Sequence, residues 1–264
     1  MIEQAGNEKT SRYRGSVQIT QPIFIFRGIY EKVAVLVDGG FYRKVAKHLW
    51  GEKSPEQRCE ELVKYCRFHL KERDNFVVEG DKRIYQYNEL YRIFYYDCEP
   101  LKKTVYNPLP QKNFDFAKSP TFVWMNTFLN NLKQRRKVAL RMGFFADEEM
   151  NYIFSSDTVK KLCKGSLKIE DLSESDLVLN MRQKGVDMKI GLDIASLAYK
   201  KLADQIVLIS GDSDFVPAAK LARVEGIDFI VDSMGMKIND NLIEHIDGLR
   251  SYYKRFGASE TDGE

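Results

Sequence analysis

The sequence predicts an α/β protein of three layers (α/β/α), with helices on both faces of a mostly parallel, twisted sheet. Continuous apolar runs, typical of strands that are buried on both faces, recur along the chain. Segments with the apolar spacing of a helix separate these runs, and this alternation is typical of parallel sheets with crossover connections. The predicted strands cover residues 32–37, 92–96, 205–209 and 227–231.

Two helices are predicted between the first and second strands. The tight turn 38–40 leads into a helix with apolar residues on one face. Residues 54–57 form a capping box with proline at the first helical position, which predicts a helix running to about residue 73.

The middle of the chain predicts more irregular structure. Residues 99–120 hold four of the seven prolines and are expected to be mostly loop. A helix is predicted from 124 to about 136. We then expect segments 137–145 and 150–154 to pair as a hairpin around the short acidic stretch between them.

The last third returns to alternating helices and strands. Residues 186–202 are helical by spacing, and a turn at 210–214 follows the third strand. A further helix ends at Gly226, a residue typical of helix C-termini. A final helix is predicted over 239–255.

These elements predict one domain over residues 31–255. Residues 1–30 are expected to form an N-terminal arm and residues 256–264 a flexible tail. A basic loop and helix with a hairpin, at about 101–180, are predicted as an insertion.

Composition excludes several classes of protein. Hydrophobic residues at 44% and charged residues at 30% are typical of globular proteins and exclude a wholly disordered, collagenous or coiled-coil chain. No apolar run is long enough for a membrane span, and the first residues lack a secretory signal, so we expect a cytoplasmic protein. The four cysteines form no CxxC pair, and the three histidines form no HExxH motif. A zinc knuckle or a histidine-based centre is therefore not expected.

Charge is distributed unevenly along the chain. Residues 101–141 carry nine Lys/Arg and one Asp/Glu, whereas residues 142–264 carry 15 and 22. The basic middle favours a polyanionic partner, and a simple solvated surface is the alternative.

Acidic residues follow all four predicted strands. The carboxyl ends of parallel strands lie at one edge of a sheet, where ligands bind. A helix that precedes a parallel strand starts at the same edge, so Asp187 is expected there too. Asp193, six residues further along that helix, would lie roughly 9 Å deeper. The acids after the strands are Asp38, Asp97, Asp212 with Asp214, and Asp232.

Crowded carboxylates raise one another's pKa, unless they hold a hard divalent cation such as Mg²⁺ or Mn²⁺. Such ions assist phosphodiester hydrolysis, and the cluster therefore predicts a metal-dependent nuclease. Each acid also has a structural explanation as a helix cap or turn residue. Asp97 and Asp232 are more often turn residues than ligands, and we place them in a second tier.

Four segments that match in order resemble the NYN domain family, in the LabA-like branch of the PIN-like nuclease superfamily. The last two are the most specific. The segments are VAVLVDGGFY (33–42), FYYDCEP (94–100), RQKGVDMKIGLDIASLA (182–198) and IVLISGDSDFVPAAKLARVEGIDFIVD (206–232).

The resemblance implies a PIN-like fold with a metal-dependent ribonuclease site. By motif, Asp38 would be the first-strand ligand, Asp187 the helix acid, and Asp212 with Asp214 the later carboxylates. Asp193 matches a further recurring acid. The chain departs from the family at residues 40–41, Gly and Phe, where many relatives carry asparagine.

We hypothesise that one or two Mg²⁺ or Mn²⁺ ions among these carboxylates promote in-line attack of water on phosphorus. We expect the protein to be an endoribonuclease. Ser210 and Ser213 would position water or phosphate. RNA is the expected partner, with DNA an alternative, held by phosphate contacts and base stacking. The candidate phosphate-binding residues are Lys184, Lys133, Arg135, Arg136, Lys102 and Lys103, and the interleaved aromatic residues are Tyr91, Phe94, Tyr95, Tyr96, Tyr106 and Phe114.

Other functions fit less well. A phosphatase of the haloacid-dehalogenase type requires a second aspartate two residues after the nucleophile, and residue 40 is glycine. The GxGxxG and P-loop motifs of nucleotide-binding proteins are absent. A Toprim nuclease would carry glutamate after its first strand. A non-catalytic RNA-binding or regulatory module, and a nuclease active only within a larger toxin or defence assembly, stay open, as does a homo-oligomer.

Overall fold

The computed structural model describes residues 31–79, 82–146 and 150–261, so the predicted arm at 1–30 lies outside the described residues. Its centre is a seven-stranded sheet of order β10-β7-β4-β1-β11-β12-β13. Every neighbouring pair is parallel except β10 with β7. The strands are β1 (Lys32–Asp38), β4 (Glu89–Cys98), β7 (Val138–Phe145), β10 (Gln183–Lys184), β11 (Gln205–Ile209), β12 (Asp228–Asp232) and β13 (Gly248–Leu249).

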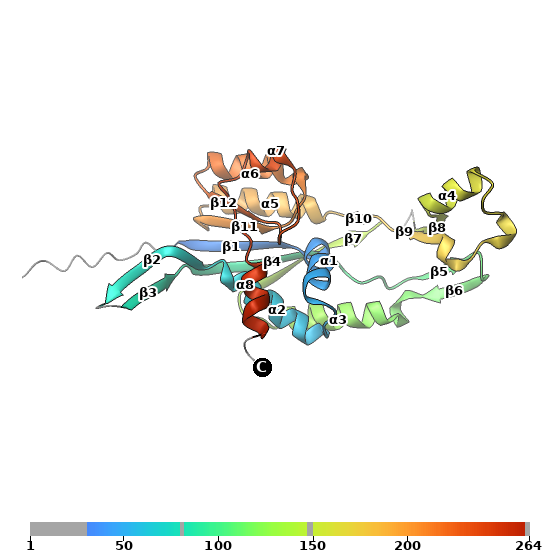
Figure 1. Ribbon diagram of the computed structural model, residues 1–264, viewed down its shortest axis with the longest axis horizontal. Coiled ribbons are helices and arrows are strands. Elements are labelled where there is room, and N and C mark those ends of the chain that lie inside the picture. The colour runs from blue at the N-terminus through green and yellow to red at the C-terminus, as the bar shows by residue number, and fades with distance from the viewer. Residues whose placement is uncertain (1–30, 80–81, 147–149, 262–264) are drawn as a thin grey trace, which may run out of the picture.

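Helices cover both faces of this sheet, which confirms the predicted α/β fold (Figure 1). One face carries α5 (Val186–Tyr199), α6 (Val216–Val224) and α7 (Asp240–Ile243). The other carries α1 (Gly39–Trp50), α2 (Pro55–Phe68), α3 (Pro120–Lys133) and α8 (Tyr253–Thr261). Short 3-10 turns occur at Phe116–Lys118, Ile169–Asp171, Glu174–Asp176 and Ser213–Phe215.

The continuous apolar run of β1 supplies both halves of the core. Val33, Val35 and Val37 pack toward α1, α2 and α3, while Ala34 and Leu36 pack toward α5 and α6. All five residues are fully buried. A strand buried on both faces needs no polar alternation, and this is why the run identified the strand.

The segment after α2 differs from the prediction. The capping box at Ser54 and Gln57 is present, but the helix ends at Phe68 and not near residue 73. The chain instead enters β2 (Lys71–Glu79), which pairs antiparallel with β3 (Lys82–Tyr87).

The predicted hairpin of 137–145 with 150–154 is wrong. β7 pairs parallel with β4, because Val138, Leu140 and Met142 pack against the central core. β8 (Asn151–Phe154) pairs instead with β9 (Leu177–Asn180).

The region 101–180 is therefore not one insertion, since α3 and β7 within it belong to the central domain. Residues 99–120 are also less irregular than expected, because β5 (Thr104–Asn107) and β6 (Lys112–Asp115) form a hairpin.

The predicted helix over 239–255 is also wrong. Gly248 and Leu249 pair with β12 and interrupt it. The chain then forms α8, whose Phe256 is buried against the rings of Trp50 and Tyr65. The domain boundary expected at residue 255 therefore passes through a packed helix, and the tail proposed for 256–264 does not begin at 256.

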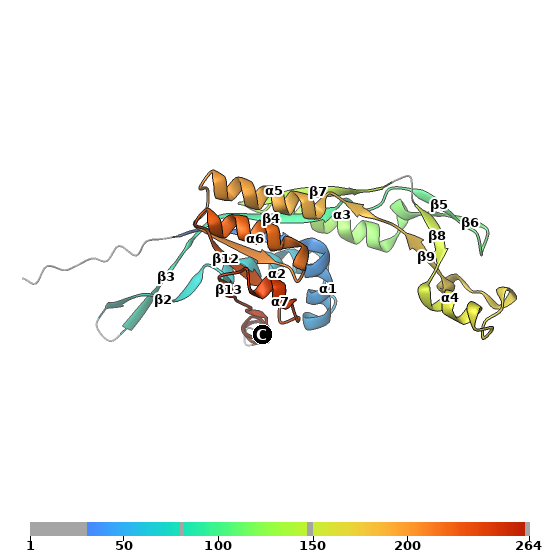
Figure 2. The same ribbon diagram turned by 90° about the horizontal axis from the view of Figure 1, so that it is seen from above.

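Two extensions project from opposite ends of the central domain (Figures 1 and 2). The β2–β3 hairpin projects from one end. At the other, β5–β6, β8–β9 and α4 (Ser156–Cys163) project beyond the carboxyl ends of β4 and β7. We call this second extension the distal arm, comprising residues 101–119 and 150–182. No helix within the described ranges is long and apolar enough to cross a membrane.

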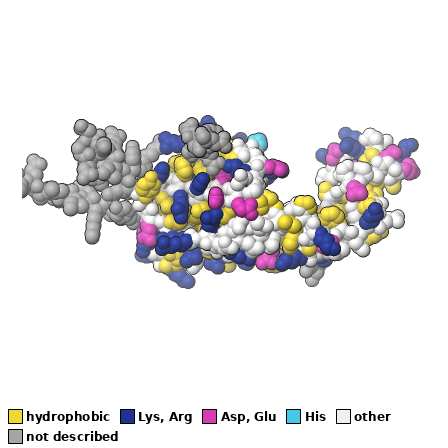
Figure 3. Space-filling view, turned by 90° about the horizontal axis from the view of Figure 1, so that it is seen from below, with side chains coloured by type: hydrophobic (Ala, Val, Ile, Leu, Met, Phe, Trp, Pro, Cys, Tyr) yellow, Lys and Arg dark blue, Asp and Glu magenta, His cyan; other side chains and the backbone are white. Residues whose placement is uncertain are grey.

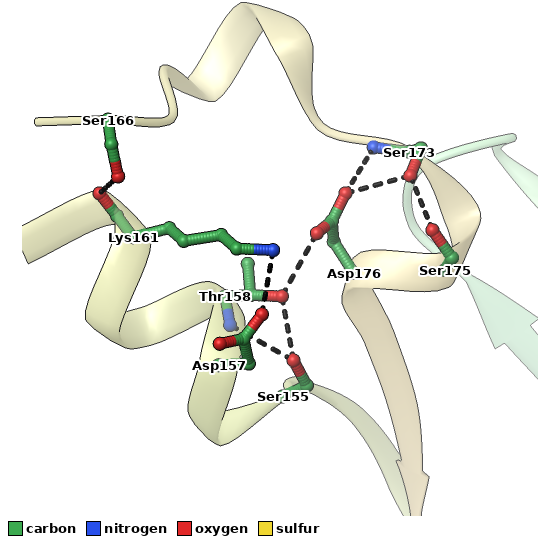
Figure 4. Close-up of polar contacts among 8 residues, drawn as sticks. All are labelled: Ser155, Asp157, Thr158, Lys161, Ser166, Ser173, Ser175 and Asp176. Carbon is green, nitrogen blue, oxygen red and sulfur yellow. Dashed lines mark hydrogen bonds and ion pairs between the residues drawn. The ribbon is translucent and has the colours of Figure 1, made fainter.

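A polar network holds α4 to the chain that precedes β9 (Figure 4). Ser155 caps α4 by accepting a hydrogen bond from the Thr158 N–H at 3.1 Å. The Thr158 hydroxyl donates to Asp176 Oδ1 at 3.0 Å, and the Ser173 N–H donates to Asp176 Oδ2 at 2.9 Å. The Ser173 hydroxyl also donates to Oδ2, at 2.8 Å, so three donors from two residues hold the Asp176 carboxylate at the tip of the distal arm.

Candidate active site

Asp38 ends β1 and caps α1, the helix that follows. Its Oδ1 accepts a hydrogen bond from the Phe41 N–H at 3.0 Å, and its Oδ2 accepts one from the Ser210 hydroxyl at 3.3 Å. The side chain is half-buried. Burial raises the pKa of Asp38, and the charges of Asp187 and Asp97 raise it further, whereas the two hydrogen bonds lower it.

The turn after β11 brings two more carboxylates to the same edge. The buried Ser210 accepts a hydrogen bond from the Asp212 N–H at 3.3 Å while it donates to Asp38, and so it links β1 to this turn. Asp212 Oδ1 accepts from the Asp214 N–H at 3.0 Å, and both aspartates are exposed. Ser213 lies between them and is half-buried.

Asp187 comes to this edge from α5. It lies in the first turn of the helix, where a carboxylate is favoured by the helix dipole. The N-cap is Gly185 at φ 83°, a left-handed conformation that favours glycine. Desolvation raises the pKa of Asp187, and the charges of Asp212 and Asp214 raise it further. The four aspartates predicted as ligands therefore influence one another from three different elements.

This set of donors matches a hard divalent cation in its chemistry, because it consists of carboxylate oxygens without thiol or imidazole. Beyond the effect of burial, the charge of Asp187 raises the pKa of Asp38, and the charges of Asp212 and Asp214 raise that of Asp187. A cation would relieve this repulsion. No three His, Cys, Asp or Glu side chains in the described part of the chain are already grouped tightly enough to hold an ion. Ligand side chains would therefore have to move toward a cation that binds here.

Asp97, a second-tier candidate, lies at this edge but is fully engaged. Arg43 from α1 donates to both of its oxygens at 3.0 Å, and the Tyr95 hydroxyl donates to Oδ2 at 2.9 Å. The Cys98 N–H donates to Oδ1 at 2.8 Å. The side chain is 2% exposed. Because both of its oxygens already accept hydrogen bonds, these contacts support a structural role for Asp97.

Asp232, the other second-tier candidate, is fully buried. Its Oδ2 accepts from the Tyr65 hydroxyl at 2.6 Å and contacts His69 Nε2 at 2.9 Å. Its Oδ1 accepts from the Met234 N–H and the Ser251 hydroxyl. These contacts join α2 to the end of β12 and support a structural role for Asp232 as well.

Asp193 is paired across the sheet surface. Arg141 of β7 contacts its two oxygens at 2.8 and 2.9 Å, and the Tyr96 hydroxyl donates to Oδ2 at 2.8 Å. Tyr96 and Arg141 are partners in the β4–β7 register. This arrangement supports a role in holding α5 against the sheet.

The basic candidates separate into two groups. Lys184 lies in β10 next to Phe144 of β7, close to the start of α5. Lys102 and Lys103 follow β4 and line a hollow of about 590 Å³ beside Gly143 and Phe144, at the acidic edge. The residues Lys133, Arg135 and Arg136 instead lie where α3 ends and β7 begins, which is the opposite edge of the sheet.

The aromatic candidates divide in a similar way. Phe94, Tyr95 and Tyr96 are buried in β4 and belong to the core, and Tyr91 is half-buried. Tyr106 and Phe114 are 54% and 47% exposed on the distal arm. Phe114 also lines a second hollow of about 500 Å³ at the acidic edge, with Arg43, Asp97, Phe122 and Gln183 among the other lining residues.

Sequence reasoning missed Arg43 and Arg141, which neutralise Asp97 and Asp193. No motif marks Arg43, although its position five residues after Asp38 places it in the first helix at the acidic edge. Arg141 could have been found from the β4–β7 pairing, had β7 been recognised as a strand of the central sheet.

One family model covers most of the chain. The family model described as NYN domain matches residues 32–250. No curated protein matches the chain. A crystal structure of a protein of unknown function from Vibrio parahaemolyticus is 14% identical, with a TM-score of 0.41, and the match covers 84% of this chain and 93% of that one.

Proposed function

The chain belongs to the NYN domain family, and from this membership, which indicates a nuclease, we propose that it is a metal-dependent enzyme that hydrolyses phosphodiester bonds in RNA. We further propose internal cleavage, by an endoribonuclease, with Mg²⁺ or Mn²⁺ as the cofactor. The reacting phosphate would lie at the edge formed by Asp38, Asp187, Asp212 and Asp214.

One observation carries this proposal. Three separate elements, β1, α5 and the turn after β11, bring four carboxylates to one edge of the sheet. Desolvation raises the pKa of Asp38 and of Asp187, and neighbouring carboxylates raise both further. Such crowding destabilises a fold that does not use it, whereas a hard cation makes it favourable. Two further acids near this edge, Asp97 and Asp193, are paired with arginines.

The residues around the site hold its carboxylates in place. The Phe41 N–H and the Ser210 hydroxyl fix both oxygens of Asp38. Ser210 also contacts the turn that carries Asp212, so one hydroxyl sets the spacing between two ligands. A bound divalent cation would lower the pKa of a water and neutralise the charge on the scissile phosphate.

The same edge can attract the substrate. Lys184, Lys102 and Lys103 lie around the carboxyl ends of β4 and β7, and their charges favour a phosphate backbone. Ser213, between the two exposed aspartates, would donate to a phosphate oxygen. The exposed Tyr106 and Phe114 offer stacking surfaces on the distal arm.

The test is cleavage of a labelled single-stranded RNA with Mn²⁺ or Mg²⁺, compared with the same reaction in EDTA. We expect cleavage only with the metal and none by an Asp38→Asn/Asp212→Asn variant. A circular RNA distinguishes internal from terminal cleavage, and a DNA of the same sequence defines the substrate class. Binding without cleavage of any of these by the folded, metal-loaded protein would support a non-catalytic RNA-binding module instead.

A further inference from the structure

A basic hollow of about 630 Å³ lies at the amino edge of the sheet, away from the four carboxylates. We call it the amino-edge hollow. No acidic residue is among the described residues that line it. Its basic lining residues are Lys64, Arg67, Lys71, Arg136 and Lys137, and rings of Phe68 and Tyr87 lie beside them.

Several separate elements bring these cations together. Lys64 and Arg67 are three residues apart on α2, and this spacing places them on one face of the helix. Lys71 begins β2, while Arg136 and Lys137 form the turn between α3 and β7. Figure 3 views the molecule from the side of α2 and α3, where Lys and Arg side chains are prominent on the central domain.

Three of these cations form no ion pair within the described part of the chain. Lys64, Arg67 and Arg136 are exposed and form no ion pair with any side chain that the structure describes. Their neighbours show the contrast, since Arg135 pairs with Glu60 at 3.4 Å and Lys137 with Glu89 at 3.2 Å. Unneutralised charges of one sign around a hollow raise the local concentration of anions.

The rings indicate which anion fits. Lys71 Nζ lies 5.1 Å from the centre of the Phe68 ring and 5.5 Å from that of Tyr87. The Tyr87 side chain is 50% exposed. Cations together with an accessible aromatic face are typical of sites for single strands, which offer both phosphates and unstacked bases. A free phosphate or a lipid headgroup would use the cations but not the ring.

We propose that the amino-edge hollow is an anchoring site for single-stranded nucleic acid, remote from the acidic edge. Lys64, Arg67 and Arg136 contact phosphates, and Tyr87 stacks on a base. The hollow and the carboxylates lie at opposite ends of β1, which is about 20 Å long. At roughly 3.4 Å per stacked nucleotide, a strand that reaches both has about six nucleotides or more. Binding at the amino-edge hollow does not require the protein to cleave nucleic acid. The expected dependence of cleavage on strand length does rest on the proposed function.

Binding is measured by fluorescence anisotropy of a labelled 20-nucleotide single strand, in EDTA, with the Asp212→Asn protein and with Asp212→Asn carrying Arg67→Gln/Arg136→Gln. We expect the added pair of changes to weaken binding at least tenfold at about 100 mM salt. A plot of log affinity against log salt has a negative slope, and its magnitude should decrease by about 1.4. Each lost phosphate contact contributes about 0.7 to that magnitude. The matched control is Lys160→Gln/Lys164→Gln, which removes two exposed charges from α4 and its C-cap and should leave affinity unchanged.

Tyr87 tests the stacking contact. Tyr87→Ala should weaken binding about tenfold, and Tyr87→Phe should restore it, since the ring and not the hydroxyl stacks. Unchanged affinity in Arg67→Gln/Arg136→Gln overturns the proposal. The proposal also fails if Tyr87→Ala leaves the affinity for the oligonucleotide unchanged and inorganic polyphosphate or anionic vesicles bind this variant as tightly as the oligonucleotide does. The hollow would then be a general anion site.

Cleavage gives an independent readout. With an intact acidic edge, Arg67→Gln/Arg136→Gln should slow hydrolysis of a subsaturating 20-nucleotide strand in proportion to the lost affinity and leave a dinucleotide unaffected. Equal slowing of both substrates contradicts remote anchoring. If no substrate is cleaved but the binding results hold, the proposed function fails and the anchoring site stands.

Discussion

Arg43 donates one hydrogen bond to each oxygen of Asp97, both at 3.0 Å, and so joins α1 to the end of β4. Arg43 is the residue that distinguishes Asp97 from the other carboxylates of the acidic edge. Asp97 is 2% exposed, and a buried carboxylate of this kind is stable only when it is paired.

We predict that Arg43→Met destabilises the protein by roughly 3 kcal/mol, because it leaves Asp97 buried without its cation. Urea unfolding of Arg43→Met, Asp97→Asn and the double variant measures this effect. The double variant should cost less than the sum of the two single changes, since each removes the same pair. Strict additivity would show that the two side chains do not depend on each other.

Asp187 and Asp193 lie six residues apart on α5 and should differ in their effect on cleavage. We expect Asp187→Asn to lower kcat by more than about 100-fold, which exceeds the usual effect of losing a group outside the ligand shell. Asp193→Asn should retain most activity per folded molecule, because Arg141 and Tyr96 already occupy its oxygens. Metal-dependent RNA cleavage by both proteins at saturating Mn²⁺ compares them, and equal losses would assign Asp193 to the site.

The pKa of Asp38 predicts how stability depends on pH. Because this pKa is raised on folding, the folded protein holds the proton more tightly than the unfolded chain. Stability is therefore lost as pH rises from the unfolded value near 3.9 through the folded pKa, and the full penalty is present above it. Asp38→Asn removes the penalty and keeps the helix cap.

We therefore expect Asp38→Asn to raise Tm at pH 7 by a few degrees and to match wild type near pH 3. Differential scanning calorimetry at both pH values tests this, with the exposed Asp171→Asn as the control. Adding Mn²⁺ should raise Tm more in wild type than in Asp38→Asn, because the variant lacks a ligand. A lower Tm for Asp38→Asn at pH 7 would contradict the sign of this effect.

Gly39 and Gly40 are adjacent glycines that differ in whether they can accept a side chain. A Cβ on Gly39 would lie 2.5 Å from the Tyr95 ring and 2.6 Å from Asp97 Oδ2, whereas a Cβ on Gly40 would meet only Asp38 Oδ1 at 3.5 Å. Gly39→Ala should cost about 1–3 kcal/mol by overpacking and reduce cleavage, since it displaces the start of α1 beside Asp38. Gly40→Ala should be close to neutral in both stability and cleavage.

The buried strands and their acidic ends could be predicted from the sequence because both follow from one rule. Continuous apolar runs mark parallel strands, and the carboxyl ends of such strands share an edge. The same rule placed Asp187, because a helix before a parallel strand begins at that edge. By this rule Asp38 and Asp97 are alike, and the sequence placed Asp97 in the second tier only as a common turn residue. The Arg43 contact with Asp97 could not be predicted.

The location of residues 133–137 at the amino edge could not be predicted for a related reason. Once β7 is known to be parallel to β4, the helix before it must end at the amino edge, and the basic run belongs there. Pairing 137–145 with its neighbour in sequence concealed this. The partner of β7 is β4, which α3 and the β5–β6 hairpin separate from it in the chain.

The position of β1 in the sheet also constrains how the chain is made. Its neighbours are β4 and β11, and Val33 pairs with Gln205, 172 residues later in the chain. At about 5–20 residues per second, a ribosome needs roughly 10–30 s to deliver that second neighbour. Throughout this time Val33–Val37 would present an unpaired edge, with every side chain apolar, to other nascent chains. Expression yield should therefore depend on translation speed and chaperone supply more than the stability of the finished protein would suggest.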